Sequence, residues 1–442
     1  MLDRAFSFFR SRNSATQLLI GYAGLSTIGF LLLCLPFMQA ESATGFDHFF
    51  IATSAVSTTG LVSVDPGSAY TLGGQIVILL LIQLGGIGYL TLGSLIFAAA
   101  ARRFEAKPDK QTASEFSLPD EVTTGSFLLS VTLYTVICEL IGAAILYTLF
   151  TQAGVDQPLW SAIFHSISAF CTAGFSLNSD SFASFATNTP VLLTLSTLSI
   201  LGAIGFLIVW DLARSVKNRR FRFCYTSRVI LAVSTILIAA GTFAVFVSDQ
   251  RLLDFAPENR LPIAFFEAMT ASTTVGFNVL PTDQIGGTTF LFIILLMAIG
   301  ASPSGTGGGL KTTTFAVIIA TMYASLRQRN RVRLFGRKIK DDKLRAASST
   351  TDFYILLLLG SVLILSVSET GPGLQSLFFE TVSALGTVGL SMGATSELSP
   401  IGMGVIGILM IAGRVGILAF GIALVSSDQS ERELKNADKV ED

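Results

Sequence analysis

The chain has 442 residues, of which 51% are hydrophobic and only 13% are charged, and its mean hydropathy is +0.66. Soluble proteins carry about 25% charged residues, so this composition excludes an ordinary soluble domain and indicates a membrane protein that crosses the bilayer several times. The cysteines and histidines are too scattered for a metal site, and no Ser/His/Asp or Cys/His constellation points to an enzyme. They are Cys34, Cys138, Cys171, Cys224, His48 and His165.

One order of elements repeats along the chain, which predicts units of residues 1–125, 126–228, 229–345 and 346–442. Each unit has a first apolar stretch, a short amphipathic stretch, a polar turn-rich segment and a second apolar stretch. The first stretches are Leu18–Ala40, Ser126–Phe150, Val229–Ser248 and Phe353–Ser368; the second are Leu72–Ala100, Pro190–Ala213, Thr289–Leu326 and Pro400–Ser426. A transmembrane helix needs about 20 apolar residues, so we expect eight spanning helices, two in each unit.

A short segment marks the same place in every unit: AVSTTGL, AFCTAGF, ASTTVGF and ALGTVGL, starting at Ala55, Ala169, Ala271 and Ala384. Aligned on the glycine, every copy has Thr two residues earlier, Ala five residues earlier and Phe ten residues earlier. The stretch between Phe and Gly is too short to cross the membrane, so we expect a half-helix that enters and turns back. We therefore predict an all-α polytopic fold with four parallel helix–pore loop–helix repeats around one central pore.

Lysine and arginine are distributed unequally between the two sides of this arrangement. The pore-loop side carries only Arg251 and Arg260, whereas the other side carries the N-terminal arginines and three basic linkers. These are Arg4, Arg10 and Arg12; Arg102, Arg103, Lys107 and Lys110; Arg214, Lys217, Arg219, Arg220, Arg222 and Arg228; and nine residues from Arg327 to Arg345. Because cytoplasmic loops are enriched in Lys and Arg, we predict a multi-pass protein of the cell (plasma/inner) membrane with both termini in the cytoplasm. Such short linkers suit membrane lipids or a cytosolic partner, and not a nucleic acid.

The repeated glycine has a chemical meaning at the end of a half-helix. Glycine adopts positive φ without steric cost, so four such turns can aim backbone carbonyls at one axis, where they replace the hydration shell of K⁺. The Thr hydroxyl adds an oxygen, and the C-terminal ends of four half-helices favour a cation. The predicted K⁺-binding filter residues are Thr58, Thr59, Gly60, Thr172, Ala173, Gly174, Thr274, Val275, Gly276, Thr387, Val388 and Gly389. The alternative is that these segments are ordinary joints with small residues for close helix packing.

The fourfold pattern with these glycines resembles the Trk/Ktr/HKT superfamily of potassium-translocating subunits over nearly the whole chain. With eight expected spans it is most similar to the Ktr-type (KtrB-like) membrane subunit. In that superfamily Ser at the first filter glycine accompanies sodium permeation, so Gly60 implies a preference for potassium. The resemblance also implies a homodimer with one pore per copy and a cytosolic nucleotide-binding ring protein (KtrA/TrkA-like) as regulator. Whether Na⁺ acts as an activator stays open.

The third unit departs from the others below the filter. Residues 300–309 read GASPSGTGGG and contain no large apolar side chain, so they cannot continue a lipid-facing helix. We predict a broken helix with a flexible polar loop on the cytoplasmic side, in which hydroxyls bond to one another across the pore. The resemblance implies an intramembrane gate at this place. The predicted gate residues are Gly300, Ser302, Ser304, Gly305, Thr306, Gly307, Gly308, Gly309, Lys311 and Arg414.

Several charged residues lie in apolar or pore-loop segments and need partners. Arg414 is expected either to bond the carbonyls of the loop in unit three or to pair with an acid such as Glu267 or Glu380. Lys311 either joins the gate or extends to the cytoplasmic interface. Glu267 and Glu380 either brace pore-loop amides or only charge the N-terminal part of a half-helix. Glu139 should find a buried partner that the sequence does not identify.

The leading functional hypothesis is a gated, potassium-selective pore of a Ktr/Trk-type uptake system. One alternative is a symporter that couples sodium or protons to cation entry, and another is a sodium-permeable member of the same family. Carriers commonly contain inverted repeats, whereas an even number of spans per unit makes these units parallel, which favours the channel. A membrane scaffold or receptor would not need four Thr-x-Gly segments in register.

Overall fold

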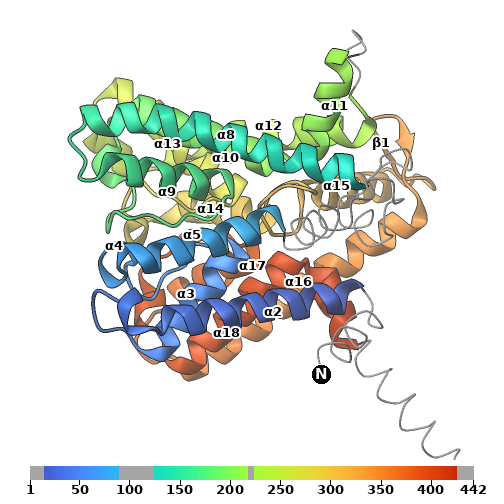
Figure 1. Ribbon diagram of the computed structural model, residues 1–442. Coiled ribbons are helices and arrows are strands. Elements are labelled where there is room, and N and C mark those ends of the chain that lie inside the picture. The colour runs from blue at the N-terminus through green and yellow to red at the C-terminus, as the bar shows by residue number, and fades with distance from the viewer. Residues whose placement is uncertain (1–13, 89–123, 218–222, 426–442) are drawn as a thin grey trace, which may run out of the picture.

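A computed structural model describes residues 14–88, 124–217 and 223–425 of the chain (Figure 1). The first helices of the four units are α2 (Ser14–Leu33), α8 (Thr124–Gln152), α12 (Tyr225–Ser248) and α16 (Asp341–Ser368). Within the described ranges, these four helices are long and apolar enough to cross a membrane without a break. Several basic residues used above for the orientation lie outside those ranges: Arg4, Arg10, Arg12, Arg102, Arg103, Lys107, Lys110, Arg219, Arg220 and Arg222.

Each first helix is followed by a short, buried helix that we call a pore helix. The pore helices are α3 (Gly45–Ser57), α9 (Pro158–Phe170), α13 (Pro257–Thr273) and α17 (Leu374–Gly386). The sequence starts them with standard signals: Thr44 and Asp47 form a capping box at α3, and α9 and α13 begin with proline. The pore helices end at the repeated Thr-x-Gly segments, so the predicted half-helix and turn are present in every unit.

The second helix of units one, two and four ends at a glycine. Helix α5 (Leu72–Ile87) ends at Gly88, α10 (Thr189–Ile204) ends at Gly205, and α18 (Pro400–Val415) ends at Gly416. Their φ angles of 89°, 95° and 98° are positive, a conformation that ends a right-handed helix and that glycine adopts readily. Helix α10 meets α11 (Phe206–Lys217) at 90°, and α18 meets the helix at 417–425 at 106°. The sequence predicts a break only in unit three, so these sharp bends are a difference between prediction and structure.

In unit three the interruption is a loop rather than a single glycine. Helix α14 (Gly287–Ile299) ends at Gly300, and α15 (Thr312–Leu326) begins after Lys311. The predicted broken helix is therefore present over the predicted residues. A small antiparallel pair, β1 (Arg333–Leu334) and β2 (Arg337–Lys338), then leads into α16. Short helical turns complete the connections: η1 (Pro36–Met38), α4 (Pro66–Ala69), η2 (Ala183–Phe185), η3 (Gln250–Asp254), η4 (Thr282–Gln284) and η5 (Ala394–Glu397).

The four units pack around an axis in chain order. Within a unit, the pore helix packs against both the first and the second helix. Between units, the second helix of one unit packs against the pore helix of the next: α5 against α9, α10 against α13, α14 against α17, and α18 against α3. The last pair closes the circle. Glycines allow close approach inside each unit, because Gly85, Gly202 and Gly413 lie directly against the backbone carbonyls of Val56, Phe170 and Leu385.

Candidate functional site

The four Thr-x-Gly turns share one unusual backbone conformation. The threonines lie in the left-handed region, with φ of 51°, 50°, 59° and 49° for Thr58, Thr172, Thr274 and Thr387. The glycines also have positive φ, namely 90°, 67°, 82° and 92° for Gly60, Gly174, Gly276 and Gly389. A non-glycine residue at positive φ costs about 1–3 kcal/mol and persists only where its surroundings enforce it. The same conformation at the same two positions of all four turns shows that the turns are structurally equivalent.

The four turns form a closed ring. A Cβ atom placed on any of the four glycines would collide with the carbonyl oxygen of the middle residue in the next turn. The contacts run from Gly60 to Ala173, from Gly174 to Val275, from Gly276 to Val388, and from Gly389 back to Thr59. All twelve predicted filter residues therefore lie in one ring of backbone. The four glycines also line one cavity of about 310 Å³ on the pore-loop side of this ring.

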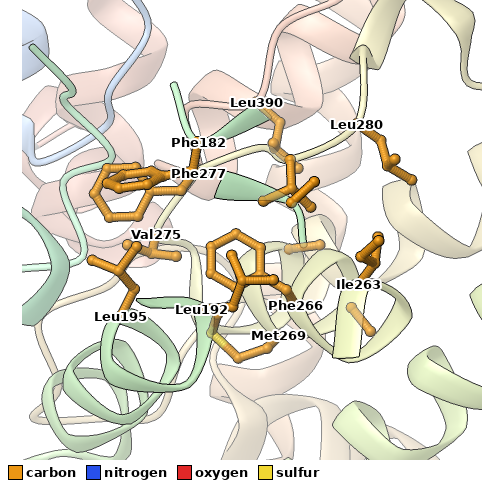
Figure 2. Packing of buried hydrophobic residues seen from close by; sticks show 14 of the residues in the cluster. Phe182, Leu192, Leu195, Ile263, Phe266, Met269, Val275, Phe277, Leu280 and Leu390 are labelled. Carbon is orange, nitrogen blue, oxygen red and sulfur yellow. The ribbon is translucent and has the colours of Figure 1, made fainter. Parts of the chain in front are cut away.

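Apolar side chains fix the outside of the ring. The residues that follow the filter glycines are Leu61, Phe175, Phe277 and Leu390, and each is at most 1% exposed. Figure 2 shows Phe277 beside Phe182, with Val275 and Leu390 in the same cluster, and the two phenyl rings meet edge to face with centroids 5.0 Å apart. Aromatic contacts of this kind have a defined geometry, so they restrict the movement of the turns that carry them.

Hydroxyl side chains inside the pore helices hold the turns in place, and the sequence reading did not select them. The Gly60 amide donates to Ser54 Oγ at 3.1 Å, and the Gly389 amide donates to Ser383 Oγ at the same distance. Ser168 Oγ donates to the Phe175 carbonyl at 2.8 Å. The four repeated segments do contain a signal for these hydroxyls. Each predicted filter glycine has Ser or Thr six residues earlier, namely Ser54, Ser168, Thr270 and Ser383.

A second set of side chains braces the segments just after the filter. Glu380 accepts hydrogen bonds from the Met392 amide at 2.9 Å, Ser391 Oγ at 2.6 Å and Thr395 Oγ1 at 2.7 Å. Glu267 accepts from two amides, those of Val279 and Leu280, both at 3.1 Å. The bracing alternative for these two glutamates thus agrees with the geometry.

The equivalent positions in the other two units differ. In unit two His165 Nε2 accepts from the Leu177 amide at 3.2 Å, so a histidine replaces the carboxylate. In unit one the equivalent residue is Ile51, whose side chain has no polar atom to offer. The filter is therefore supported chemically in different ways around the ring.

The loop of unit three lies directly beneath the filter threonines. Thr58 Oγ1 donates to the Thr306 carbonyl at 3.4 Å, and the Thr172 and Thr306 hydroxyls are 3.0 Å apart. A Cβ atom on Gly307 would meet the hydroxyl of Thr274, and one on Gly308 would meet that of Thr387. The segment from Thr306 to Gly308 thus touches all four threonines and covers the ring on the side opposite the cavity.

The loop is tied to unit two mainly through backbone carbonyls. Ser302 Oγ donates to the Ala203 carbonyl at 2.5 Å, and the Thr306 amide donates to the Gly202 carbonyl at 3.2 Å. The Phe206 amide at the start of α11 donates to the Ser304 carbonyl at 3.1 Å. We expected hydroxyls to bond to one another across the pore; Thr172 and Thr306 do so, whereas Ser302 bonds to the end of α10.

Two cationic side chains hold the loop from below. Arg414 donates to the Thr306 carbonyl and to the carbonyls of Gly85 and Gly86, the last at 2.9 Å. Lys311 Nζ donates to the Gly307 carbonyl. Of the alternatives above, Arg414 therefore bonds the loop rather than Glu267 or Glu380, and Lys311 points into the loop rather than toward the interface.

The buried partner of Glu139 is a glutamine. Gln83 Nε2 in α5 donates to Glu139 Oε2 at 3.0 Å, and Cys171, directly before the filter of unit two, lies beside both. This polar contact joins the first helix of unit two to the second helix of unit one. The sequence could not identify Gln83, because the contact depends on how α5 and α8 are rotated toward each other.

Comparison with known proteins agrees with this architecture. The family model TrkH, a cation transport protein, matches residues 24–433. The chain belongs to the TrkH family of cation transport proteins. The resemblance inferred from the four glycine turns is thereby confirmed, and the protein is a membrane-embedded cation transporter rather than an enzyme.

Individual relatives of this TrkH-family chain extend over nearly its full length. It is 35% identical to the Ktr system potassium uptake protein B of Bacillus subtilis, over 93% of each chain. It is 32% identical to the potassium/sodium uptake protein NtpJ of Enterococcus hirae, over 96% of each. The crystal structure of the potassium transporter TrkH from Vibrio parahaemolyticus superposes with a TM-score of 0.75 at 18% identity, covering 94% of this chain and 85% of that one. The likeness to that structure supports the all-α polytopic fold.

Proposed function

We propose that this chain is the potassium-translocating membrane subunit of a Ktr/Trk-type uptake system and works as a gated, selective pore. The observation that carries the proposal is the closed ring of four Thr-x-Gly turns, in which every glycine lies against a carbonyl of the next turn. The names of the relatives in Bacillus subtilis and Enterococcus hirae, which refer to uptake of potassium and of potassium or sodium, support the choice of ion.

Selection depends on the carbonyl oxygens of the ring. A cation that leaves the outer cavity exchanges its water ligands for backbone oxygens, and this exchange favours the ion that the ring fits. The backbone amides of the turns donate to Ser54 and Ser383, and those of the following segments donate to Glu267, Glu380 and His165. These bonds hold the turns so that they cannot collapse around a smaller ion. Glycine in all four turns, including Gly60, supports preference for K⁺ over Na⁺.

Gating depends on the loop beneath the ring. In the arrangement described here, Thr306, Gly307 and Gly308 touch the filter threonines, and Arg414 and Lys311 place positive charges next to them. A unit positive charge about 4 Å from a passing cation costs about 4 kcal/mol at an effective dielectric constant near 20. Flux therefore requires the loop and its arginine to move away from the axis, and the glycines provide the conformational freedom to do so.

The proposal also includes two partners, a second copy of this chain and a cytosolic regulator. We propose that two copies form a dimer, each with its own pore, and that a cytosolic nucleotide-binding ring protein moves the loop from the side of the basic linkers. The printed name "Ktr system" of the Bacillus subtilis and Vibrio alginolyticus relatives supports a system of several components. The basic segment from Arg327 to Arg345, with both termini on the same side, is the proposed cytoplasmic face, and Na⁺ is a proposed activator rather than a bound cofactor.

The test is the zero-current potential of the purified chain in liposomes under opposed potassium and sodium gradients. A potential near the potassium equilibrium value that depends on these gradients alone is the expected result. A potential that follows the sodium or proton gradient in the manner of coupled transport would replace the pore with a symporter. A potential between the two equilibrium values would identify a sodium-permeable member of the family.

A further inference from the structure

A groove of about 560 Å³ lies on the side of the molecule between α10, α12 and α13. Helix α12 forms its long wall, and the three helices lie next to one another in Figure 1. The innermost part is lined by Thr273, the residue before the filter of unit three, and by Ala301 and Ser302 of the gate loop. We call this feature the lateral groove.

The mouth of the lateral groove is apolar and faces the region that lipid occupies. Helix α12 is long and apolar enough to cross a membrane, so hydrocarbon is the solvent along its exposed face. At the mouth, Phe243, Phe246 and Leu261 are 71%, 45% and 57% exposed. Water and polar solutes are excluded from such an opening, whereas a hydrocarbon chain is not.

The inner surface of the lateral groove is mainly apolar. Its hydroxyl groups at Thr242, Thr273 and Ser302 donate to the backbone carbonyls of Ile238, Met269 and Ala203 at 2.7, 2.8 and 2.5 Å. The lining also includes the hydroxyls of Ser234, Thr235 and Ser272, so a few polar groups interrupt an otherwise apolar surface. Recognition inside the lateral groove therefore rests mainly on shape and apolar contact.

The dimensions agree with a lipid chain. Along α12 the groove runs from Leu231 to Phe246, which is about 22 Å at the rise of an α-helix. An extended chain that fills one leaflet of roughly 15 Å fits within this length. We propose that the lateral groove binds one acyl chain of a membrane lipid and that this chain stabilises the loop beneath the filter.

The link to the loop is Ser302. This residue lines the lateral groove and also holds the loop to the end of α10 through the Ala203 carbonyl, four positions before Thr306 reaches the filter threonines. An acyl chain packed against Ala301 and Ser302 supports them from the lipid side. The binding of the chain does not depend on the proposed pore, whereas its effect on flux rests on that proposal.

The experiment uses two neighbouring alanines of α12 as a matched pair. Ala239 lines the lateral groove and Ala240 does not, although both are exposed. Purified full-length protein is placed in phosphatidylglycerol vesicles that contain a phospholipid with a photoactivatable group in the middle of one acyl chain. We expect labelling of residues 231–246 and 261–273 in the wild type and in Ala240→Trp, and a several-fold loss in Ala239→Trp. If Ala239→Trp does not fold, Ala239→Leu fills the same space with a smaller side chain.

Equal labelling of all three proteins, or labelling only elsewhere, overturns the binding proposal. A cross-link between two copies through Ala239→Cys, with no lipid label, overturns it in favour of a second copy as the occupant. The regulatory part has its own measurement, potassium flux in vesicles of different acyl-chain length. We expect flux to change with chain length in the wild type and Ala240→Trp and to stay constant in Ala239→Trp. The same response in all three would overturn the coupling and leave the binding result untouched.

Discussion

The two sides of the filter ring are held by different chemistry. On the outer side, buried side chains such as Ser383, Glu267 and Glu380 accept hydrogen bonds from backbone amides. On the inner side, the contacts come from a glycine-rich loop, mostly from its backbone and from the Thr306 hydroxyl, and within the described chain the hydroxyls of Thr274 and Thr387 have no hydrogen-bond partner. Breaking an outer bond leaves a buried polar group unpaired, whereas the loop meets Thr274 and Thr387 without a hydrogen bond to either hydroxyl. The outer side of the ring therefore suits a fixed structure, and the inner side suits a moving one.

The largest effect is expected from the arginine on the inner side of the ring. We expect Arg414→Ala to raise basal potassium flux by at least about tenfold, because the proposed barrier from a charge near the axis is about 4 kcal/mol. Ion preference should stay unchanged, since the outer bonds are not affected. Flux and zero-current potential in liposomes measure both quantities.

Two related variants control this experiment. Arg414→Lys keeps the positive charge but cannot make all the bonds to the carbonyls of Thr306, Gly85 and Gly86. Its basal potassium flux should therefore rise less than that of Arg414→Ala. Deletion of Ser304 to Gly308 removes the loop itself and should raise flux at least as much as Arg414→Ala. Lower flux from normally expressed protein in either of the large changes would refute the assignment of this segment as the gate.

A substitution within the ring tests whether the outer supports matter. Gly60→Ser places a side chain against the Ala173 carbonyl and should lower potassium over sodium selectivity about tenfold, equivalent to about 1.4 kcal/mol. Gly389→Ser makes the same collision with Thr59 in a turn that Glu380 braces, so this turn can yield less and flux should fall as well. Unchanged ion preference in both folded variants would contradict the filter assignment.

A smaller effect is expected from the brace of unit four. Glu380→Ala leaves the Met392 amide and two hydroxyls without their acceptor, at a cost of about 1–3 kcal/mol. Selectivity and melting temperature should both decrease. Glu380→Gln keeps an acceptor oxygen and should lie between this variant and the wild type. If Glu380→Ala changes flux but not selectivity, the brace does not act on the filter.

The smallest effect concerns a carboxylate beyond the end of α16. Burial alone would raise the pKa of Glu369, but hydrogen bonds from Ser399 and Ser368 outweigh it and hold the pKa below its ordinary value of 4.5. Since the folded pKa is the lower one, the stabilisation is present above the unfolded pKa and is lost as the pH falls through the folded value. We expect Glu369→Gln to melt at a slightly lower temperature at pH 7 and to show a weaker decrease on acidification. A melting curve that depends on pH as in the wild type would contradict this.

The sequence predicts those features of the molecule that recur in all four units, and those that differ in one unit. Thr58 and Gly60 could be aligned with their equivalents, and the run from Gly300 to Gly309 could be recognised because a lipid-facing helix cannot contain it. Cation transport and the all-α membrane fold were predicted in this way and are confirmed by the family. The filter and gate assignments, the unit boundaries and the orientation stay predictions.

Contacts between residues that are far apart in the chain could not be predicted from the sequence. Nothing in the spacing of Glu139 indicates Gln83, and no pattern shows that Gly60 of unit one meets Ala173 of unit two. The bends at Gly205 and Gly416 were missed because a single glycine is tolerated inside many helices, and only the packing around it decides whether the chain turns.

The closed ring of four unequal turns also has a consequence for how such a protein changes over time. In a pore built from four copies of one chain, a single codon change alters every wall at once. Here the four walls are encoded separately, so His165, Glu267 and Glu380 can differ from one another and from Ile51 while the ring stays closed. One unit can acquire a long loop, as unit three has done between Gly300 and Lys311, while the other three keep their single glycine. If the ring is the proposed pore, the gene can adjust its ion preference and opening one unit at a time.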